Sequence, residues 1–224
     1  MKPIIVAIDG PAGTGKSTIA RRVADRLGFV YVDTGAMYRA VALWALRLGV
    51  AMDDMHRLEQ LAAAARIEFQ PGTRQVILNG DDVTQAIRDA EVSVASSKVS
   101  SVPGVRRALV ARQREIAAAV PVVMEGRDIG SVVFPEAQVK VFLDADPMER
   151  ARRRAAETEG ASLDDVARAI AERDRRDSTR ADSPLRQAPD AEFIDTTRMS
   201  LDEVEETVLR LVRHRTSNGK DETN

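Results

Sequence analysis

The chain has 224 residues, a formal net charge of −2 and no cysteine. This length is enough to bury a core without covalent staples, and the missing thiols exclude a disulfide framework, a thiolate zinc site and a cysteine nucleophile. The near-neutral charge argues against nucleic acid held on a broad basic surface, and no apolar run reaches the roughly 18 residues of a membrane span. We therefore expect a cytoplasmic protein without signal peptide, membrane or nucleic-acid partner.

The first quarter of the chain alternates short apolar runs with helical patterns. Strands are predicted at residues 4–8 and 29–32, and helices at 16–27 and 34–48. Gly28 and Gly49 follow the two helices as stop signals, and Thr34 is suited to cap the second. A strand–helix–strand–helix order predicts a parallel sheet with right-handed crossovers.

The pattern changes over the next forty or so residues. Segment 58–65 has a helical pattern, and segments 66–70 and 75–78 predict a hairpin around the turn Pro71–Thr73. Asn79-Gly80 predicts a further turn. We therefore expect a small antiparallel α+β insert at 61–98.

The second half returns to strands and helices. Pro103 begins a predicted helix that runs to Ala119. Strands are predicted at 122–124, 139–143 and 192–194, and helices at 148–157, 162–175 and 200–214. The polar tail after Thr216 is expected to fray. Together these elements predict an α/β fold, a P-loop three-layer sandwich whose central parallel sheet has helices on both faces.

Residues 10–17 fit the phosphate-loop pattern G-x-x-x-x-G-K-[ST], and they lie between a predicted strand and a predicted helix, as the motif requires. Glycines let successive backbone N–H groups turn toward a phosphate, and the helix points its positive end at the anion. Lys16 then reaches the β- and γ-phosphates, and Ser17 can bind Mg²⁺. The predicted site for ATP and Mg²⁺ consists of Gly10, Pro11, Ala12, Gly13, Thr14, Gly15, Lys16, Ser17 and Thr18.

A phosphate loop alone does not separate a kinase from a nucleotide switch. The sequence has no guanine-reading Asn-Lys-x-Asp segment, and no acid directly follows Asp144 to polarise a water. Asp144 itself can either cap the next helix or bind a metal. A kinase needs arginines that hold a second anion in line with the γ-phosphate. Candidates are Arg39, Arg106, Arg127, Arg150, Arg153, Arg154, Arg173 and Arg180.

Three segments resemble signatures of the bacterial cytidylate kinases. Residues 33–39 (Asp-Thr-Gly-Ala-Met-Tyr-Arg) resemble the acceptor-phosphate motif, 125–135 the second signature, and 172–180 the lid-side motif. The resemblance covers nearly the whole chain, including the insert. It implies a monomeric enzyme of pyrimidine nucleotide metabolism that phosphorylates CMP and dCMP with ATP.

The resemblance also implies roles for individual residues. The catalytic set is Lys16, Arg150 and Arg154, of which the two arginines are four apart on one predicted helix face. The acceptor-binding set is Thr34, Tyr38, Arg39, Ser97, Arg106, Arg127, Asp128, Arg173, Asp177 and Arg180. Within this set Arg39, Arg127 and Arg180 would hold the acceptor phosphate. Asp128, with Ser97 and Arg106, would read cytosine, whose amino group donates to a carboxylate.

The implied organisation has three parts. A P-loop core comprises 1–60, 99–149 and 176–224, an acceptor-binding insert comprises 61–98, and a short lid comprises 150–175. The lid is expected to be mobile without ligand, because it is charged, poor in aromatics and interrupted by Gly160.

Several alternatives stay open. Ser97 can be a simple helix-terminal hydroxyl, Arg153 a solvated surface charge and Glu125 a buried structural acid; His56 and His214 are assigned no catalysis. Other kinases remain candidates, of the UMP, adenylate, thymidylate or shikimate type, although the Arg127-Asp128 signature and the insert disfavour them. A nucleotide-dependent switch is the alternative from another class.

Overall fold

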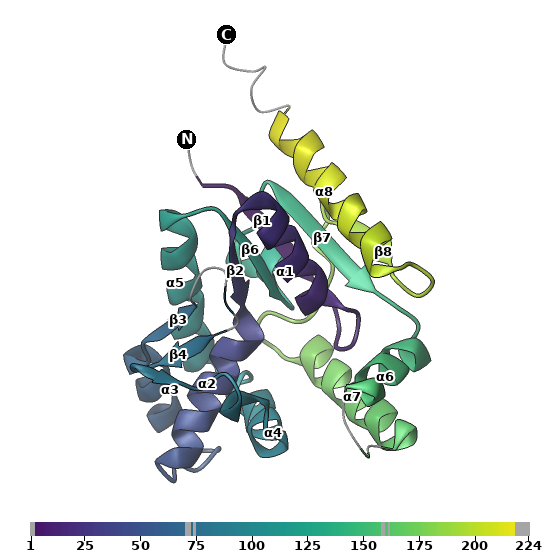
Figure 1. Cartoon of the computed structure of the whole chain (residues 1–224). Helices are drawn as coiled ribbons and strands as arrows, with labels where there is room; N and C mark the ends of the chain where they lie inside the picture. The colour runs from purple at the N-terminus through teal and green to yellow at the C-terminus, as the bar shows by residue number, and fades with distance from the viewer. Residues whose placement is uncertain (1–2, 70–72, 74, 158–159, 161, 218–224) are drawn as a thin grey trace. The chain divides into compact units, whose positions relative to one another are not determined.

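A computed structural model describes residues 3–69, 73, 75–157, 160 and 162–217, and the chain divides into two compact units (Figure 1). Unit 1 combines residues 1–30 with 120–224, and unit 2 comprises 31–119. The boundaries of these units differ from those of the expected core, insert and lid. The functions expected of the core, the insert and the lid stay predictions.

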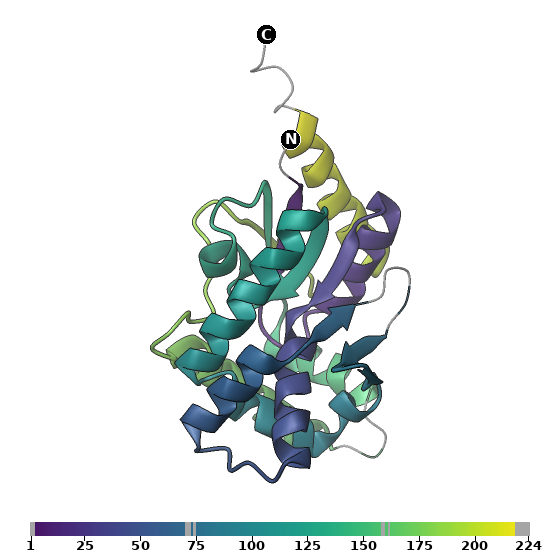
Figure 2. The same cartoon turned by 90° about the vertical axis from the view of Figure 1, so that its left-hand side faces the viewer.

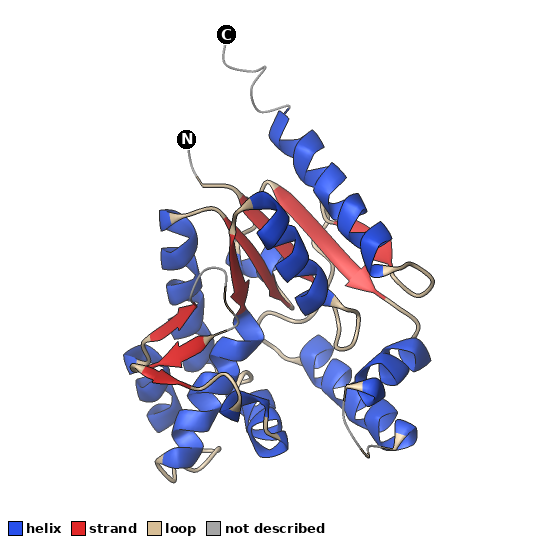
Figure 3. Ribbon diagram, viewed as in Figure 1, coloured by secondary structure: helices blue, strands red, loops and turns tan. Residues whose placement is uncertain are grey.

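The sheet of unit 1 is parallel. Its strands are β1 (Ile5–Asp9), β6 (Val122–Gly126), β7 (Val139–Asp144) and β8 (Glu192–Asp195), drawn red in Figure 3. The order is β2-β6-β1-β7-β8, and β2 (Val30–Asp33) begins with Val30, whose N–H donates to the Pro121 carbonyl at 3.0 Å. Asp9 lies opposite Gly126 at the carboxyl end of the β1–β6 ladder. β-Branched and apolar residues fill the three central strands β1, β6 and β7, which are buried on both faces, whereas three of the four residues of the edge strand β8 are exposed.

The helices of unit 1 follow the predicted order. They are α1 (Lys16–Leu27), α6 (Pro147–Ala156), α7 (Leu163–Thr179) and α8 (Leu201–Ser217), with a π-helical turn η2 (Ile129–Val133) after β6. α1 packs against β6 and α8, and α6 packs along α7 (Figure 1). α1 ends at Gly28, whose φ of 67° is the left-handed conformation of a C-cap.

Three differences from the predictions lie near the expected site. The cap of the helix after β2 is Asp33, not Thr34, because the Asp33 carboxylate accepts from the Ala36 N–H at 2.8 Å. α6 is capped by Asp146 and not by Asp144. α7 continues to Thr179 and ends where Arg180 turns to extended backbone, so the expected lid boundary at 175 falls within a helix.

Unit 2 combines helices with a small antiparallel sheet. Its elements are α2 (Thr34–Arg47), α3 (Met55–Ala64), β3 (Ile67–Phe69), β4 (Val76–Leu78), β5 (Asp81–Asp82), η1 (Ala86–Arg88), α4 (Ala90–Val99) and α5 (Pro103–Ala119). α3 packs along α5, and α2 packs against α4 (Figures 1 and 2). The predicted hairpin is confirmed as β3–β4, although residues 70–72 and 74 of its turn lie outside the described residues. Asn79 and Gly80, with φ of 54° and 95°, form the predicted second turn.

The predicted α/β class is confirmed: a central parallel sheet has helices on both sides. Within the part of the chain that the structure describes, no helix combines the length and the apolar character that a membrane crossing requires.

Candidate active site

The phosphate loop of unit 1 has a backbone that only glycine tolerates at two positions. Gly10 has a φ of 146°, and a Cβ there would lie 2.0 Å from the Leu143 carbonyl oxygen. Gly13 has a φ of 79°, and a Cβ there would lie 2.8 Å from the Arg150 carbonyl oxygen. The loop therefore packs directly against main chain, in a glycine conformation that can turn its backbone N–H groups toward an anion at the start of α1.

Lys16 is folded back onto this loop. Its Nζ donates to the Pro11 carbonyl at 2.5 Å and lies 3.4 Å from the Thr14 hydroxyl, and the side chain is buried. The pKa of Lys16 is lowered to about 7, first by burial and then by the charges of Arg127 and Arg173, while Glu125 and Asp174 act in the opposite direction. An anion that accepted from this amine would restore its full positive charge, so the lysine is poised for a phosphate.

Ser17 carries the oxygen that sequence reasoning assigned to a metal. Its hydroxyl donates to the Glu125 carboxylate at 2.9 Å, and Glu125 is buried at the end of β6. Glu125 is thus a buried acid that faces the phosphate loop. Hydroxyl and carboxylate oxygens are the hard ligands that Mg²⁺ prefers, so this pair fits the ion. Over the described ranges, no group of three or more histidine, aspartate or glutamate side chains is arranged to hold a metal ion.

Arg150 lies against the phosphate loop. Its guanidinium donates to the carbonyls of Ala12 and Ala145, each at 3.1 Å, and to the Asp174 carboxylate on α7. The other oxygen of Asp174 accepts from the Ala12 N–H at 3.2 Å. Asp174 therefore joins α7 to a loop amide, and sequence reasoning missed it although it lies within the lid-side motif. The available signal was a carboxylate three residues before Asp177, on the same helix face.

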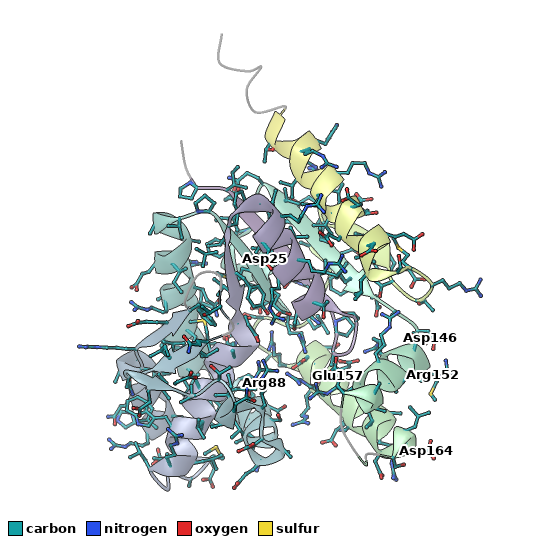
Figure 4. All side chains as sticks on the ribbon, viewed as in Figure 1. Asp25, Arg88, Asp146, Arg152, Glu157 and Asp164 are labelled. Atoms are coloured by element: carbon teal, nitrogen blue, oxygen red, sulfur yellow. The ribbon has the colours of Figure 1, made fainter. Side chains whose placement is uncertain are left out.

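Arg154 has a different environment from Arg150. The Arg154 side chain is exposed, and its guanidinium lies 2.8 Å from the Glu157 carboxylate at the end of α6. Figure 4 labels Glu157 and the neighbouring Arg152. Arg153 is not the solvated surface charge considered as an alternative. Its guanidinium donates to the Thr196 hydroxyl at 3.0 Å and to the Thr196 carbonyl at 2.8 Å. The Thr196 hydroxyl in turn approaches the Thr14 carbonyl at 3.3 Å, so Arg153 supports the phosphate loop.

Unit 1 also holds two arginine–aspartate pairs. Arg127 Nε lies 2.9 Å from the Asp177 carboxylate, and Arg180 Nη2 lies 3.5 Å from the Asp128 carboxylate. The Arg180 Nε donates to the Ser183 carbonyl at 2.5 Å. All four paired side chains are largely buried, with 8–17% of each exposed. Buried charge is costly even when paired, so a concentration of it beside the phosphate loop indicates a functional site.

Unit 2 brings together further predicted acceptor residues. The Arg106 guanidinium lies 5.7 Å from the centre of the Tyr38 ring, a cation–π distance. Arg39 pairs with Asp33 at 2.9 Å, so Asp33 both caps α2 and orients Arg39, a double role that sequence reasoning missed. The predicted residues Thr34 and Ser97 are buried and half-buried respectively on α2 and α4. Their assignment to the acceptor stays a prediction, and the helix-terminal alternative for Ser97 stays open.

Both histidines are exposed. His56 contacts Gln60 at 2.9 Å on α3, and His214 lies on the last turns of α8. The expectation that neither histidine takes part in catalysis stays a prediction.

Comparison with known proteins points to one family. The cytidylate kinase family model matches residues 6–214. A cytidylate kinase of Solibacter usitatus is 62% identical over 98% of this chain and 97% of its own length, and one of Syntrophotalea carbinolica is 50% identical over 96% and 94%. Among solved structures, a gluconokinase of Sinorhizobium meliloti aligns over 100% of this chain and 99% of its own with a TM-score of 0.53 and 14% identity, which supports the fold alone.

The phosphate loop, the buried arginine–aspartate pairs and a family match over nearly the whole length agree with one another. The chain belongs to the cytidylate kinase family and is a kinase.

Proposed function

We propose that this kinase phosphorylates CMP and dCMP with ATP and Mg²⁺, as a cytoplasmic monomer of pyrimidine nucleotide metabolism. The observation that carries the proposal is the placement of the pairs Arg127–Asp177 and Arg180–Asp128 in the same unit as Lys16. The charge of Arg127 lowers the pKa of Lys16, so the two cations are close. A donor loop and a second anion site within range of one lysine are what phosphoryl transfer between two nucleotides requires.

The donor side is the phosphate loop of residues 10–18. Its amides and Lys16 would bind the β- and γ-phosphates of ATP, and Ser17 with Glu125 would hold Mg²⁺, which supplies charge neutralisation during transfer. Arg150, already against Ala12, would exchange its contact with Asp174 for the transferred phosphoryl group. These groups stabilise charge and position atoms, because a loose phosphoryl-transfer transition state needs little covalent assistance.

The acceptor side is proposed to comprise the residues of the predicted acceptor-binding set. Arg127, Arg180 and Arg39 would bind the phosphate of CMP, since three guanidiniums match one dianion. Asp128 would accept from the cytosine amino group, with Ser97 and Arg106 beside the base. Thr34 and Tyr38 would line the acceptor site, and Arg173 and Asp177 would contact the sugar hydroxyls. Segment 61–98 would contribute to binding of the monophosphate.

A panel of monophosphates tests the proposed function. CMP, dCMP, UMP, AMP, dTMP and shikimate are each supplied with ATP–Mg²⁺, and diphosphate or phosphate-ester formation is measured. CMP and dCMP are expected to give the highest kcat/KM. Hydrolysis of ATP that is independent of every acceptor would instead favour a nucleotide switch, and preference for AMP or dTMP would favour another kinase type. Sedimentation of the same preparation checks the monomer.

We expect the helices α6 and α7 to act as a lid over the reacting phosphates. The Asp174 contacts to Ala12 and Arg150 give these helices a direct connection to the donor loop. Hydrogen exchange with and without ATP plus CMP measures the change. Protection is expected to rise between Ala155 and Ser162, of which residues 158–159 and 161 lie outside the described residues. Equal protection in both states would contradict a lid in this segment.

Arg150 and Arg154 form a matched pair for mutation, because they are one turn apart on α6. Arg150→Ala is expected to lower kcat by about tenfold or more, since it removes a cation that touches the donor loop. Arg154→Ala is expected to cost less, because Arg154 is exposed and paired with Glu157. Steady-state kinetics at saturating ATP and CMP separate them; a larger loss for Arg154 would mean that it turns inward when substrates bind.

A further inference from the structure

Asp9 is a buried carboxylate at the junction of β1 and the phosphate loop. It is the last residue of β1, directly before Gly10, and only 5% of it is exposed. Its two carboxylate oxygens accept from two successive amides, the Ile129 N–H at 2.8 Å and the Gly130 N–H at 2.7 Å. These amides begin η2, the turn that follows Arg127 and Asp128.

The contacts of Asp9 hold both ends of the two-residue segment Arg127-Asp128, here called the bridge. Its main chain lies opposite Gly126 in the β1–β6 ladder, which fixes the residue before Arg127. Its side chain holds Ile129 and Gly130, which fixes the residues after Asp128. Arg127 and Asp128 therefore leave the sheet on a segment whose two ends are both bound to the same aspartate.

Core packing alone does not explain an acid here. The pKa of Asp9 is raised to about 6: burial raises it most and the charge of Asp128 adds to this, while the two amide hydrogen bonds and Lys16 only partly oppose them. Because the pKa is raised on folding, the stabilising effect of the bound proton is present below the ordinary value of 3.8 and is lost as the pH rises through about 6. Above about pH 6 the fold therefore holds an ionised carboxylate at a cost in stability, which the two amide hydrogen bonds partly offset.

We infer that Asp9 is a positioning residue for the acceptor: it clamps the bridge that carries Arg127 and Asp128 to the end of the donor strand. Its ionised carboxylate accepts both amides, so the acceptor-binding side chains keep their place relative to the phosphate loop of the same unit. Asp9 touches neither substrate, and it acts through Arg127 and Asp128. The inference rests on the proposed function, since it assigns those two residues to the acceptor.

Asp9→Asn tests the clamp. The variant keeps the size of the side chain. Its NH₂ group, however, takes the place of one carboxylate oxygen, so a donor faces the backbone N–H that this oxygen accepted. We expect the KM for CMP to rise about tenfold, as for loss of one buried charge-assisted hydrogen bond, while the Kd for ATP measured without acceptor changes less than about twofold. Glu205→Gln is the matched control, because Glu205 is a buried acid of the same unit that pairs with Arg22 and Arg26 on α1. The control is expected to lower the melting temperature and to leave the KM for CMP unchanged.

The outcomes separate the clamp from a structural role. Equal rises in the KM for CMP and the Kd for ATP, or an unchanged KM for CMP, would overturn the inference. If Asp9→Asn does not fold, hydrogen exchange of wild-type Ile129 and Gly130 decides instead: protection close to that of the β1 amides supports the clamp, and rapid exchange overturns it. The wild-type protein is assayed first, and the acceptor used is the monophosphate it prefers. A wild-type enzyme that rejects CMP thus refutes the proposed function, whereas a clamp failure leaves that function intact.

Discussion

Lys16→Ala is expected to lower kcat on the order of 10³-fold, comparable with the removal of other charge partners of a transition state. The amine of Lys16 has only a loop carbonyl and a hydroxyl as contacts within the described loop, and burial lowers its pKa to about 7. A phosphate that accepts from the amine would give it an anionic partner and would raise its pKa again. Single-turnover transfer from ATP to CMP measures the loss.

Lys16→Met is the control for this variant. Lys16 is buried, so its loss removes packing as well as charge, and methionine restores most of the volume without the cation. Both variants are expected to lose turnover to the same extent, and Lys16→Met is expected to keep a melting temperature near that of the wild type even if Lys16→Ala lowers it. Near-normal turnover in Lys16→Met would remove the charge of Lys16 from the mechanism.

Asp128→Ala is expected to collapse the preference for CMP over UMP. If the carboxylate accepts from the cytosine amino group, its removal leaves that donor unpaired in a dry site, at a cost of about 1.5–3 kcal/mol, or roughly ten- to a hundredfold in kcat/KM. UMP has a carbonyl at that position and cannot form the bond, so the kcat/KM for UMP falls much less. The two values of kcat/KM, measured side by side, give the ratio.

The structure sharpens the alternative to base reading. Asp128 faces Arg180 at 3.5 Å, while the carboxylate partner of Arg127 is Asp177. If Asp128 only orients Arg180 for the acceptor phosphate, CMP and UMP lose equally. Asp177→Ala is the matched variant, because it removes the other carboxylate of the two pairs and is expected to weaken both substrates alike. An unchanged CMP-to-UMP ratio in Asp128→Ala would end the base-reading role.

Much of the fold could be predicted from local pattern. The phosphate loop, α1 with its Gly28 stop and α5 from Pro103 to Ala119 were predicted with correct bounds, because glycine and proline restrict the backbone at their own positions. The parallel strands were recognisable because a sheet buried on both faces needs continuous apolar runs. Caps were less predictable: Asp33 and Asp146 each had a neighbouring residue able to do the same task, Thr34 and Asp144.

The tertiary structure decided which charges meet. Spacing placed Arg150 and Arg154 on one helix face, yet only Arg150 reaches the phosphate loop, because the approach of α6 to Ala12 is set by packing and not by periodicity. The amides bound by Asp9 lie 120 and 121 residues away along the chain, and the Ala12 amide bound by Asp174 lies 162 residues away, so no local pattern could reveal these contacts. By itself the sequence determined the kind of chemistry, since a glycine-lined loop and its lysine are contiguous. Only the tertiary structure determined which group each buried carboxylate binds, because an electrostatic contact depends on distance in space and not on distance along the chain.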